Sequence, residues 1–476
     1  MTSTTPAQLL TQTTVSRPQH RAMIHQGRQY DYTDLSRMVS SVAGALQKSG
    51  VEPGGRLAIF PQPLLTLLTV LAAPQIGCGV LPLNPTLPRQ ILERLIDSTS
   101  ATHLIADRGV LSSIENLCRI LPHELSHWLE NRQLTSGKQT PLSMDEAHLY
   151  MTTSGSDTQP KVVKLSGSNI MASIRASRRR LPAGNSDTWL CCLPLYHIGG
   201  LSIPFRCVEA AATLLLHDRF DAQQICDDLH RYAVTHLSLV PAMLARLLEQ
   251  VPDFTPPKSL RVVLIGGASL SPQLYARATA AGWPLVPTYG MTENCSQIAT
   301  LYPPSTQWQP GLVGKQLDHT EIAIDADSGV IRIRGDGVMT GYLQADGQSA
   351  PHPAGAWFET GDLGAIDGDG NLIICGRSDR TLISGGENIH PARIESQLLE
   401  HPGITEVAVI GEPDPVWGDI VVAVYAGAVT EQLLQSWCIQ HLHGAWRPRR
   451  FIKTTVLPRN AMHKIDRLAL HRIINP

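Results

Sequence analysis

The chain has 476 residues, of which 43% are hydrophobic and 17% are charged, and its formal net charge is -2 at pH 7. This length and composition predict a globular protein of at least two domains and exclude disorder as the default. The near-neutral charge provides no electrostatic basis for binding nucleic acid.

Cysteine usage, the N-terminus and hydropathy all favour a cytoplasmic protein. The nine cysteines include no C-x-x-C pair, which favours buried, reduced thiols over a metal cage. Residues 1–8 lack the basic and then apolar pattern of a secretory signal. The most apolar segment, 64–81, is interrupted by Pro74, Gly77 and Gly79. We therefore expect a buried helix followed by a strand there, and no membrane span.

Helical and strand patterns alternate along the chain, which is typical of an α/β fold. We expect a helix that begins with Thr33 as its N-cap and ends at Leu46, and a later helix capped by Ser168 or Asn169. The polar, irregular composition of 122–139 predicts a surface connection. Apolar strands are expected at residues 56–60, 79–83, 103–107, 162–166, 189–197, 236–241, 260–268, 406–410 and 420–425.

Residues 150–161 read YMTTSGSDTQPK and form a hydroxyl-rich loop around one glycine. Hydroxyls and backbone N–H groups in a tight turn create an anion-binding concavity, and a nearby lysine adds a positive charge. The segment differs from the Walker pattern, and considered alone it is equally compatible with a solvated loop. The phosphate-binding interpretation assigns contacts to Thr153, Ser154, Gly155, Ser156 and Lys161.

Several of the apolar strands end in turns, which is where open α/β sheets bind their ligands. One of them ends at His197, for which a half-buried structural histidine is the alternative reading. Another ends at Gly266 and Gly267, where the missing side chains would let the backbone approach a flat ligand. Ordinary turn glycines would produce the same pattern.

Six short segments then occur in a characteristic order over essentially the whole chain. They are 152–161, the strand that ends at His197, Tyr289-Gly-Met-Thr-Glu293, Thr360-Gly-Asp362, Gly376-Arg-Ser-Asp379 and the late Lys464. This combination resembles the adenylate-forming superfamily of acyl- and aryl-CoA ligases, luciferases and peptide-synthetase adenylation domains. The resemblance implies a large N-terminal domain of mixed sheets and helices and a small, mobile α+β C-terminal domain. It also implies that ATP and Mg²⁺ activate a carboxylic acid as an acyl-adenylate, which is then transferred to a thiol.

The resemblance assigns nucleotide-binding roles to five residues. By position, Glu293 corresponds to the magnesium ligand, and Thr292 would contact the α-phosphate. Tyr289 would stack on the adenine, whereas Asp362 would accept both ribose hydroxyls and Arg377 would donate to the same ribose. For Glu293 alone, a solvated surface carboxylate is the alternative.

The same resemblance divides the chain into an adenylation domain at 1–376, a hinge at 377–379 and a small domain at 380–476. Asp379 would be the residue whose backbone torsions absorb a rotation between the adenylating and thiol-transferring states.

Further residues are expected to act on the reacting groups. Lys464 would bridge the substrate carboxylate and the α-phosphate, although a solvated tail lysine is the alternative. With His197 and Thr292 it completes the expected catalytic set. Gly385 and Gly386 would leave room for the pantetheine arm of coenzyme A.

The substrate assignment depends on Arg206. The length of the chain and the surroundings of His197 and Tyr289 look most like the o-succinylbenzoate-CoA ligases of menaquinone biosynthesis. That branch has a basic residue nine positions after the strand-end histidine, and Arg206 stands there. A guanidinium suits a second substrate carboxylate, with a structural arginine as the alternative. Gly266 and Gly267 complete the expected substrate site.

The hydroxyl-rich loop departs from the family pattern at two positions. Asp157 replaces a threonine and Thr158 replaces the second glycine. A carboxylate repels phosphate, and the missing glycine removes a position that adopts positive φ at little cost. We therefore expect reduced, but not absent, ATP turnover.

Three functions remain open at this point. The first is an acid:CoA ligase of the o-succinylbenzoate type acting on that acid or a related aryl carboxylic acid. The second is an acyl-adenylating enzyme that loads a carrier-protein thiol, and the third is a non-catalytic relative with an altered loop. The expected partners are a small carboxylic acid and coenzyme A or a carrier protein, with a homo-oligomer as a further possibility.

Overall fold

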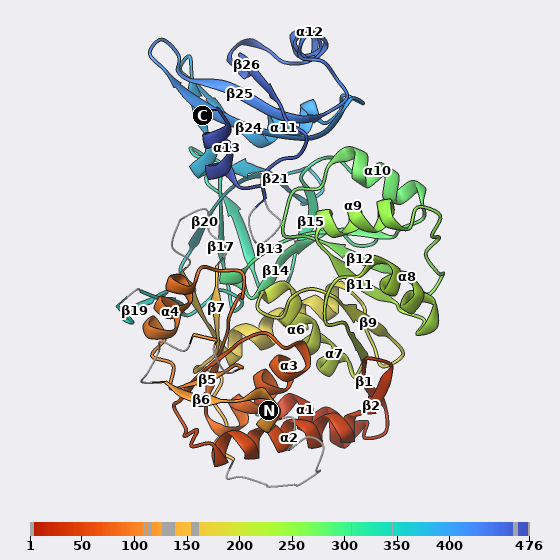
Figure 1. Cartoon of the computed structure of the whole chain (residues 1–476), viewed down its shortest axis with the longest axis vertical. Coiled ribbons are helices and arrows are strands. Elements are labelled where there is room, and N and C mark those ends of the chain that lie inside the picture. Colours follow the sequence, from red (N-terminus) through yellow and green to blue (C-terminus); the bar gives the residue numbers. More distant parts are fainter. Residues whose placement is uncertain are drawn as a thin grey trace.

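The computed structural model describes residues 4–107, 110–111, 117–125, 139–153, 161–305, 307–344, 346–459 and 465–474. In this part of the chain the strands form three β-sheets, of thirteen, eight and five strands (Figure 1). The five-stranded sheet lies in the small domain at one end of the molecule, and the other two sheets lie in the large domain.

The thirteen-stranded sheet has a parallel half and an antiparallel half. In spatial order it contains β16 (Glu321–Ile324), β17 (Val330–Arg334), β20 (Phe358–Ile366), β21 (Leu372–Arg377), β15 (Leu312–Gln316), β14 (Ser296–Thr300), β13 (Leu285–Met291), β12 (Val262–Ile265), β11 (His236–Leu239), β9 (Thr188–Cys191), β10 (Thr213–Leu216), β1 (Arg21–His25) and β2 (Arg28–Asp31). Neighbours from β13 to β1 are parallel, whereas those from β16 to β13 are antiparallel. Of the strands that carry the site, β13 lies where the two halves meet, whereas β14, β20 and β21 belong to the antiparallel half.

The other two sheets complete the two domains. The eight-stranded sheet contains β19 (Ser349–Pro351), β18 (Gly341–Leu343), β8 (Val162–Ser166), β7 (Ala147–Thr152), β4 (Gly79–Pro82), β3 (Arg56–Ile59), β5 (His103–Ile105) and β6 (Cys118–Ile120). The small sheet contains β23 (Glu387–Ile389), β22 (Leu382–Ser384), β25 (Gly418–Gly427) and β24 (Ile404–Asp414), with β26 (Arg450–Lys453) also paired to β25.

Helices cover both faces of both large sheets. Between the sheets lie α1 (Pro6–Ser16), α2 (Tyr32–Lys48), α3 (Pro63–Ala72), α6 (Gly167–Arg180) and α7 (Ile198–Ala210). The outer face of the thirteen-stranded sheet carries α8 (Ala222–Arg231), α9 (Pro241–Gln250) and α10 (Pro272–Ala280), and α4 (Arg89–Ser98) covers the eight-stranded sheet. The small domain holds α11 (Pro391–Leu398), α12 (Glu431–His441) and α13 (Arg467–Ile474).

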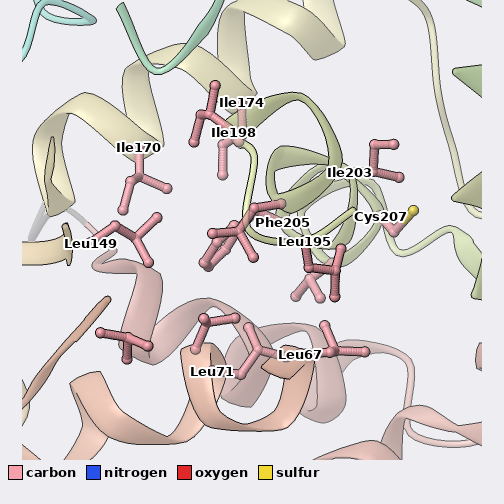
Figure 2. Close-up of a cluster of buried hydrophobic side chains, with 14 of the residues drawn as sticks. Leu67, Leu71, Leu149, Ile170, Ile174, Leu195, Ile198, Ile203, Phe205 and Cys207 are labelled. Carbon is pink, nitrogen blue, oxygen red and sulfur yellow. The ribbon is translucent and has the colours of Figure 1, made fainter. Parts of the chain in front are cut away.

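Strand side chains serve two cores because successive residues of a strand point to opposite faces. In β9, Trp189 and Cys191 belong to the central core, whereas Leu190 belongs to the outer core under α8 to α10. Figure 2 shows the central core, where Leu67 and Leu71 of α3 face Ile170 of α6 and Phe205 of α7. This packing fixes α7, which carries the predicted site residue Arg206 and follows His197, its N-cap.

Most predicted elements are confirmed, but both predicted helix caps are wrong. The N-cap of α2 is Asp31, which accepts from the backbone of Asp34, while the Thr33 hydroxyl bonds the carbonyl of Pro18. The N-cap of α6 is Ser166, paired with Asn169 in a capping box. Of the expected connection at 122–139, only residues 122–125 and 139 are described.

Two further expectations concern membrane-spanning segments and the burial of the cysteines. Among the described residues, no helix combines the length and the hydropathy needed to cross a bilayer. Seven of the nine cysteines are buried as expected, whereas Cys118 and Cys375 are exposed.

Candidate functional site

The hydroxyl-rich loop connects the antiparallel strands β7 and β8. The backbone N–H of Thr153 donates to the carbonyl of Lys161 at 3.0 Å, and the N–H of Lys161 donates to the Thr153 hydroxyl at 3.3 Å. These bonds close the two ends of the loop on each other. The predicted phosphate ligands Ser154, Gly155 and Ser156, and the departures at 157 and 158, lie outside the described residues.

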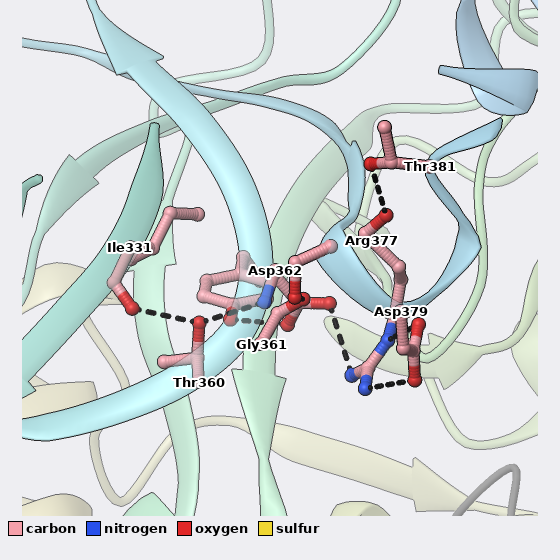
Figure 3. A network of polar contacts seen from close by, with 9 residues as sticks. Ile331, Thr360, Gly361, Asp362, Arg377, Asp379 and Thr381 are labelled. Carbon is pink, nitrogen blue, oxygen red and sulfur yellow. Dashed lines mark hydrogen bonds and ion pairs between the residues drawn. The ribbon is translucent and has the colours of Figure 1, made fainter. Parts of the chain in front are cut away.

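The side chains of Tyr289, Asp362 and Arg377 contact one another. Figure 3 shows Asp362 and Arg377 in this cluster. The Tyr289 hydroxyl donates to Asp362 Oδ2 at 2.6 Å, and an Arg377 nitrogen donates to Asp362 Oδ1 at 3.2 Å. Asp362 and Arg377 are cross-strand partners in β20 and β21, and Thr360 accepts from the Asp362 backbone N–H. Burial and the Asp362 charge raise the pKa of Tyr289 well above its usual value, so this hydroxyl remains a donor.

Glu293 lies in a short 3-10 turn, Thr292–Asn294, directly after β13. Its Oε1 accepts a hydrogen bond from the Tyr342 hydroxyl at 2.9 Å. Burial raises the pKa of Glu293, the Asp362 charge acts in the same direction, and the Lys161 charge opposes both. The carboxylate is therefore close to the loop-end lysine and to the Tyr289 cluster, with Thr292 beside it in the same turn.

The turn is followed by strained backbone. Cys295 and Ser296 both have positive φ, 50° and 102°, which is uncommon for residues other than glycine. A Cβ at Gly290 would lie 2.0 Å from the Ser296 carbonyl oxygen, so only glycine permits this close approach. Such strain persists where the surrounding structure enforces it, and it is frequent at ligand-binding sites.

Arg206 of α7 is 3% exposed, and one of its terminal nitrogens donates to the Ser296 hydroxyl at 3.0 Å. Its guanidinium carbon lies 5.6 Å from the centre of the Trp189 ring, and its Nε has no hydrogen-bond partner. Burial lowers the pKa of Arg206 to about 10. Among the described residues no carboxylate forms an ion pair with it, although buried charges are normally paired.

His197 is the N-cap residue of α7, and its ring packs edge-on against Tyr196. It is half-buried, but the predicted strand at 189–197 is wrong in its end: β9 stops at Cys191, so His197 lies six residues beyond the strand. Gly267, with φ of 81°, requires a left-handed backbone, and a Cβ at Gly266 would lie 2.8 Å from the Thr288 side chain. Local geometry therefore accounts for both glycines, and their contact with a ligand stays a prediction.

Asp379 and the glycine pair lie beyond β21. Arg377 forms two hydrogen bonds with Asp379, at 3.1 and 2.8 Å, so this arginine joins Asp362 to the predicted hinge residue (Figure 3). Gly385 and Gly386 form the two-residue turn between β22 and β23, with φ of 59° and 82°. A hairpin turn of this type itself demands glycine. Lys464 lies outside the described residues.

Four site residues carried no signal that the sequence analysis used. They are Trp189 and Ser202, which adjoin Arg206 and Ser296, Ser296 itself, and Tyr342 against Glu293. The tyrosine lies 49 residues from its partner, and no spacing rule links the two.

The side chains at the site that could bind a metal ion favour Mg²⁺. Among the described residues no group of three or more His, Cys, Asp or Glu side chains is arranged to hold a metal ion. The single carboxylate of Glu293, close to Lys161 at the end of the hydroxyl-rich loop, instead fits Mg²⁺, which commonly binds one or two carboxylates together with substrate phosphates.

Comparison with protein families gives two matches. The profile of the AMP-binding enzyme family matches residues 10–343, and that of the AMP-binding enzyme C-terminal domain matches residues 393–464. The chain belongs to the AMP-binding enzyme family. The family carries the adenylate-forming fold expected from the motifs, and the two matches agree with a large N-terminal and a small C-terminal domain.

Individual members of the AMP-binding enzyme family are similar over nearly the full length. The 2-succinylbenzoate–CoA ligase of Bacillus cereus is 32% identical over 468 residues, which cover 96% of each chain. The o-succinylbenzoate CoA synthetase of Bacillus subtilis, in complex with its acyl-adenylate intermediate, has a TM-score of 0.88 at 30% identity, with 97% of each chain covered. The same enzyme with ATP and magnesium ion has a TM-score of 0.86 at 30% identity, covering 97% of this chain and 99% of that one.

A further structure of the Bacillus subtilis enzyme matches less well. A double mutant bound to a product analogue has a TM-score of 0.72, although its identity is again 30% and 98% of each chain is covered.

Proposed function

We propose that this protein is an AMP-forming acid:CoA ligase that acts on o-succinylbenzoate. In the first step a carboxylate oxygen of the acid bonds to the α-phosphorus of ATP, and pyrophosphate leaves. In the second step the thiol sulfur of coenzyme A bonds to the acyl carbon, and AMP leaves with the electron pair of the broken mixed anhydride. The Bacillus cereus and Bacillus subtilis enzymes described above, which match over at least 96% of this chain, bear names for this activity.

The nucleotide-binding roles follow from the observed cluster. Asp362 presents a carboxylate to the ribose hydroxyls, Arg377 donates beside it, and the ring of Tyr289 stacks on the adenine. Glu293 presents an oxygen for Mg²⁺, which neutralises charge on the triphosphate when bound.

The remaining roles concern the reacting groups and the moving parts. Thr292 and His197 lie at the reacting end of the acid, Lys161 holds phosphate, and Lys464 contributes a positive charge to the attacked α-phosphate. The chain divides into an adenylation domain at 1–376 and a small domain at 380–476, and Asp379 is the hinge residue in the segment 377–379 between them. A cytoplasmic location remains a prediction from cysteine usage, the N-terminus and hydropathy, and a homo-oligomer remains untested.

The substrate class rests on one observation, the buried guanidinium of Arg206 with an unpartnered Nε and no carboxylate partner in the described chain. A charge buried in this way calls for an anion, and a dicarboxylic acid supplies one that is not consumed in the reaction. The neighbouring Ser296 hydroxyl accepts from Arg206 and keeps its own proton for the same carboxylate.

ATP-dependent pyrophosphate release tests this proposal. Wild-type protein is assayed with o-succinylbenzoate and with 3-benzoylpropionate, which lacks the ring carboxylate. Arg206→Met should lower kcat/KM for o-succinylbenzoate about a hundredfold, since it removes one partner of a buried ion pair, and should change the value for 3-benzoylpropionate little.

Two results would contradict the assignment. Inertness of o-succinylbenzoate with the wild type would reject this substrate, and equal losses on both acids would make Arg206 part of the scaffold. Free coenzyme A and a phosphopantetheinylated carrier protein are compared as thiol acceptors, and we expect the thioester to form with coenzyme A.

A further inference from the structure

Tyr342 occupies a position between two parts of the site that are far apart in sequence. It lies in β18, which pairs antiparallel with β8, and its cross-strand partner is Val163. Because Val163 follows Lys161 by two residues, β18 places Tyr342 beside the outgoing end of the hydroxyl-rich loop. The segment that leads into β18 also contacts the turn of Glu293, since the backbone N–H of Met339 donates to the Glu293 carbonyl at 2.8 Å.

The Tyr342 side chain contacts both neighbours at once. Its hydroxyl donates to Glu293 Oε1 at 2.9 Å, and Lys161 Nζ lies 5.5 Å from the centre of its ring. The first contact is a hydrogen bond to a carboxylate, and the second has the geometry of a cation–π interaction. Because the Tyr342 hydroxyl bonds Oε1, it fixes the orientation of the Glu293 carboxylate and leaves Oε2 for another partner.

We propose that Tyr342 is a positioning residue that holds the Glu293 carboxylate for Mg²⁺ with its hydroxyl and holds Lys161 at the phosphate loop with its ring. This inference rests on the proposed function, because it presupposes a bound magnesium nucleotide. A carboxylate that is oriented in advance loses less side-chain freedom when the metal binds. One residue of β18 then positions both the magnesium-binding carboxylate of Glu293 and the phosphate-binding ammonium group of Lys161.

Separate measurements of metal binding and of nucleotide binding distinguish the role of the Tyr342 hydroxyl at Glu293 from the role of its ring at Lys161. Free Mn²⁺ is measured by electron paramagnetic resonance while it is titrated into protein saturated with α,β-methylene-ATP, which cannot form an adenylate. Nucleotide affinity without metal is measured by calorimetry with AMP. Tyr342→Phe keeps the ring and loses the hydroxyl, whereas Tyr342→Gln keeps a hydrogen-bond donor and loses the ring.

Opposite patterns are expected from the two variants. Tyr342→Phe should weaken Mn²⁺ binding about tenfold, as expected for a lost hydrogen bond to a charged group, and should leave AMP affinity within about twofold. Tyr342→Gln should keep Mn²⁺ affinity within about threefold and weaken binding of the triphosphate analogue, since Lys161 loses its ring contact. Tyr232→Phe, at the end of α8 on the outer face of the thirteen-stranded sheet, is the control for loss of a tyrosine hydroxyl and should behave as wild type.

Other outcomes would overturn the proposal. Unchanged Mn²⁺ affinity in a folded Tyr342→Phe would do so, and so would equal losses in Tyr342→Phe and Tyr232→Phe. If Tyr342→Phe does not fold, loss of Mn²⁺ affinity in Tyr342→Gln would count against the role of the donor. The assay contains neither acid nor thiol, so a wrong substrate assignment leaves it unchanged. Failure of the wild type to bind the Mn²⁺ nucleotide at all would instead contradict the proposed function.

Discussion

Both oxygens of the Asp362 carboxylate are engaged by side chains of the protein, one by Tyr289 and the other by Arg377. A carboxylate has further lone pairs, so it can accept ribose hydroxyls while it keeps these donors. Arg377 divides its hydrogen bonds between Asp362 and Asp379, and hydrogen bonding to Asp379 is the main reason why its pKa is raised. The two carboxylates share one partner but only Asp362 lies beside Tyr289.

This difference predicts unequal effects of two matched substitutions. Asp362→Asn should weaken AMP binding about tenfold to a hundredfold, because the neutral amide replaces one acceptor oxygen by a donor that faces Tyr289 or Arg377. Asp379→Asn, at an exposed carboxylate, should change AMP binding less than threefold. Calorimetric titration with AMP measures both. Equal losses would mean that Asp362 acts only through Arg377.

At the scale of single elements, the β22–β23 hairpin allows a structural and a functional role of glycine to be separated. A Cβ at Gly385 would lie 2.9 Å from the Trp417 ring, whereas a Cβ at Gly386 would meet nothing within 4 Å. Both residues have positive φ, so both substitutions carry backbone strain of about 1 kcal/mol.

Gly385→Ala should therefore lower the thermal unfolding midpoint of the small domain more than Gly386→Ala. If the turn also admits the pantetheine arm, Gly386→Ala should slow thioester formation from a supplied acyl-adenylate with little loss of stability. Thioester formation by Gly386→Ala at the wild-type rate would reduce the glycine pair to a turn.

A second element-scale feature is the buried His319, which packs against Gly337 and lies 3.2 Å from the side-chain nitrogen of Asn294. Burial is the largest cause that lowers its pKa, to about 4, and the Arg179 charge acts in the same direction. Asn294 belongs to the turn that carries Glu293, so His319 contacts this turn through the Asn294 side chain.

The lowered pKa predicts loss of stability in acid. Between pH 6.5 and about 4 the unfolded chain binds a proton at His319 that the folded protein does not bind. The free energy of unfolding should therefore fall as the pH falls through this window, by roughly 3 kcal/mol from this residue alone. Thermal midpoints of wild type and His319→Gln at pH 7.5 and 5 measure the effect. The variant should lose less stability on acidification, and an identical loss in both proteins would argue against it.

At the scale of the whole molecule, the acyl-adenylate complex of the Bacillus subtilis enzyme matches with a TM-score of 0.88, and Arg377 of this chain binds both Asp362 and Asp379. The product-analogue complex of that enzyme has the lower TM-score of 0.72. We therefore expect the second step to require movement at the segment that contains Asp379.

Restricting that segment should separate the two steps. Asp379→Pro fixes φ at one residue and should leave pyrophosphate release within about fivefold of wild type, while coenzyme A thioester formation falls at least a hundredfold. Pyrophosphate and thioester are assayed separately on the same protein. Retained thioester formation would place the pivot at another residue.

The sequence by itself was sufficient for the α/β class, the order of the motifs and the family. Strands such as 56–60 and 236–241 can be predicted because their apolar pattern is contained in a few consecutive residues. The family motifs brought Tyr289, Asp362 and Arg377 to attention, and the structure places these three together. The cap of α6 was also within reach, since Ser166 and Asn169 have the spacing of a capping box.

Only the tertiary structure decided which distant residues share a contact. Thr33 lies inside α2, and its hydroxyl donates to the carbonyl of Pro18, 15 residues away. Arg206 and Ser296 meet across 90 residues, and Tyr342 reaches Glu293 through the pairing of β18 with β8. Such contacts depend on how sheets and helices pack, and no local pattern encodes that packing.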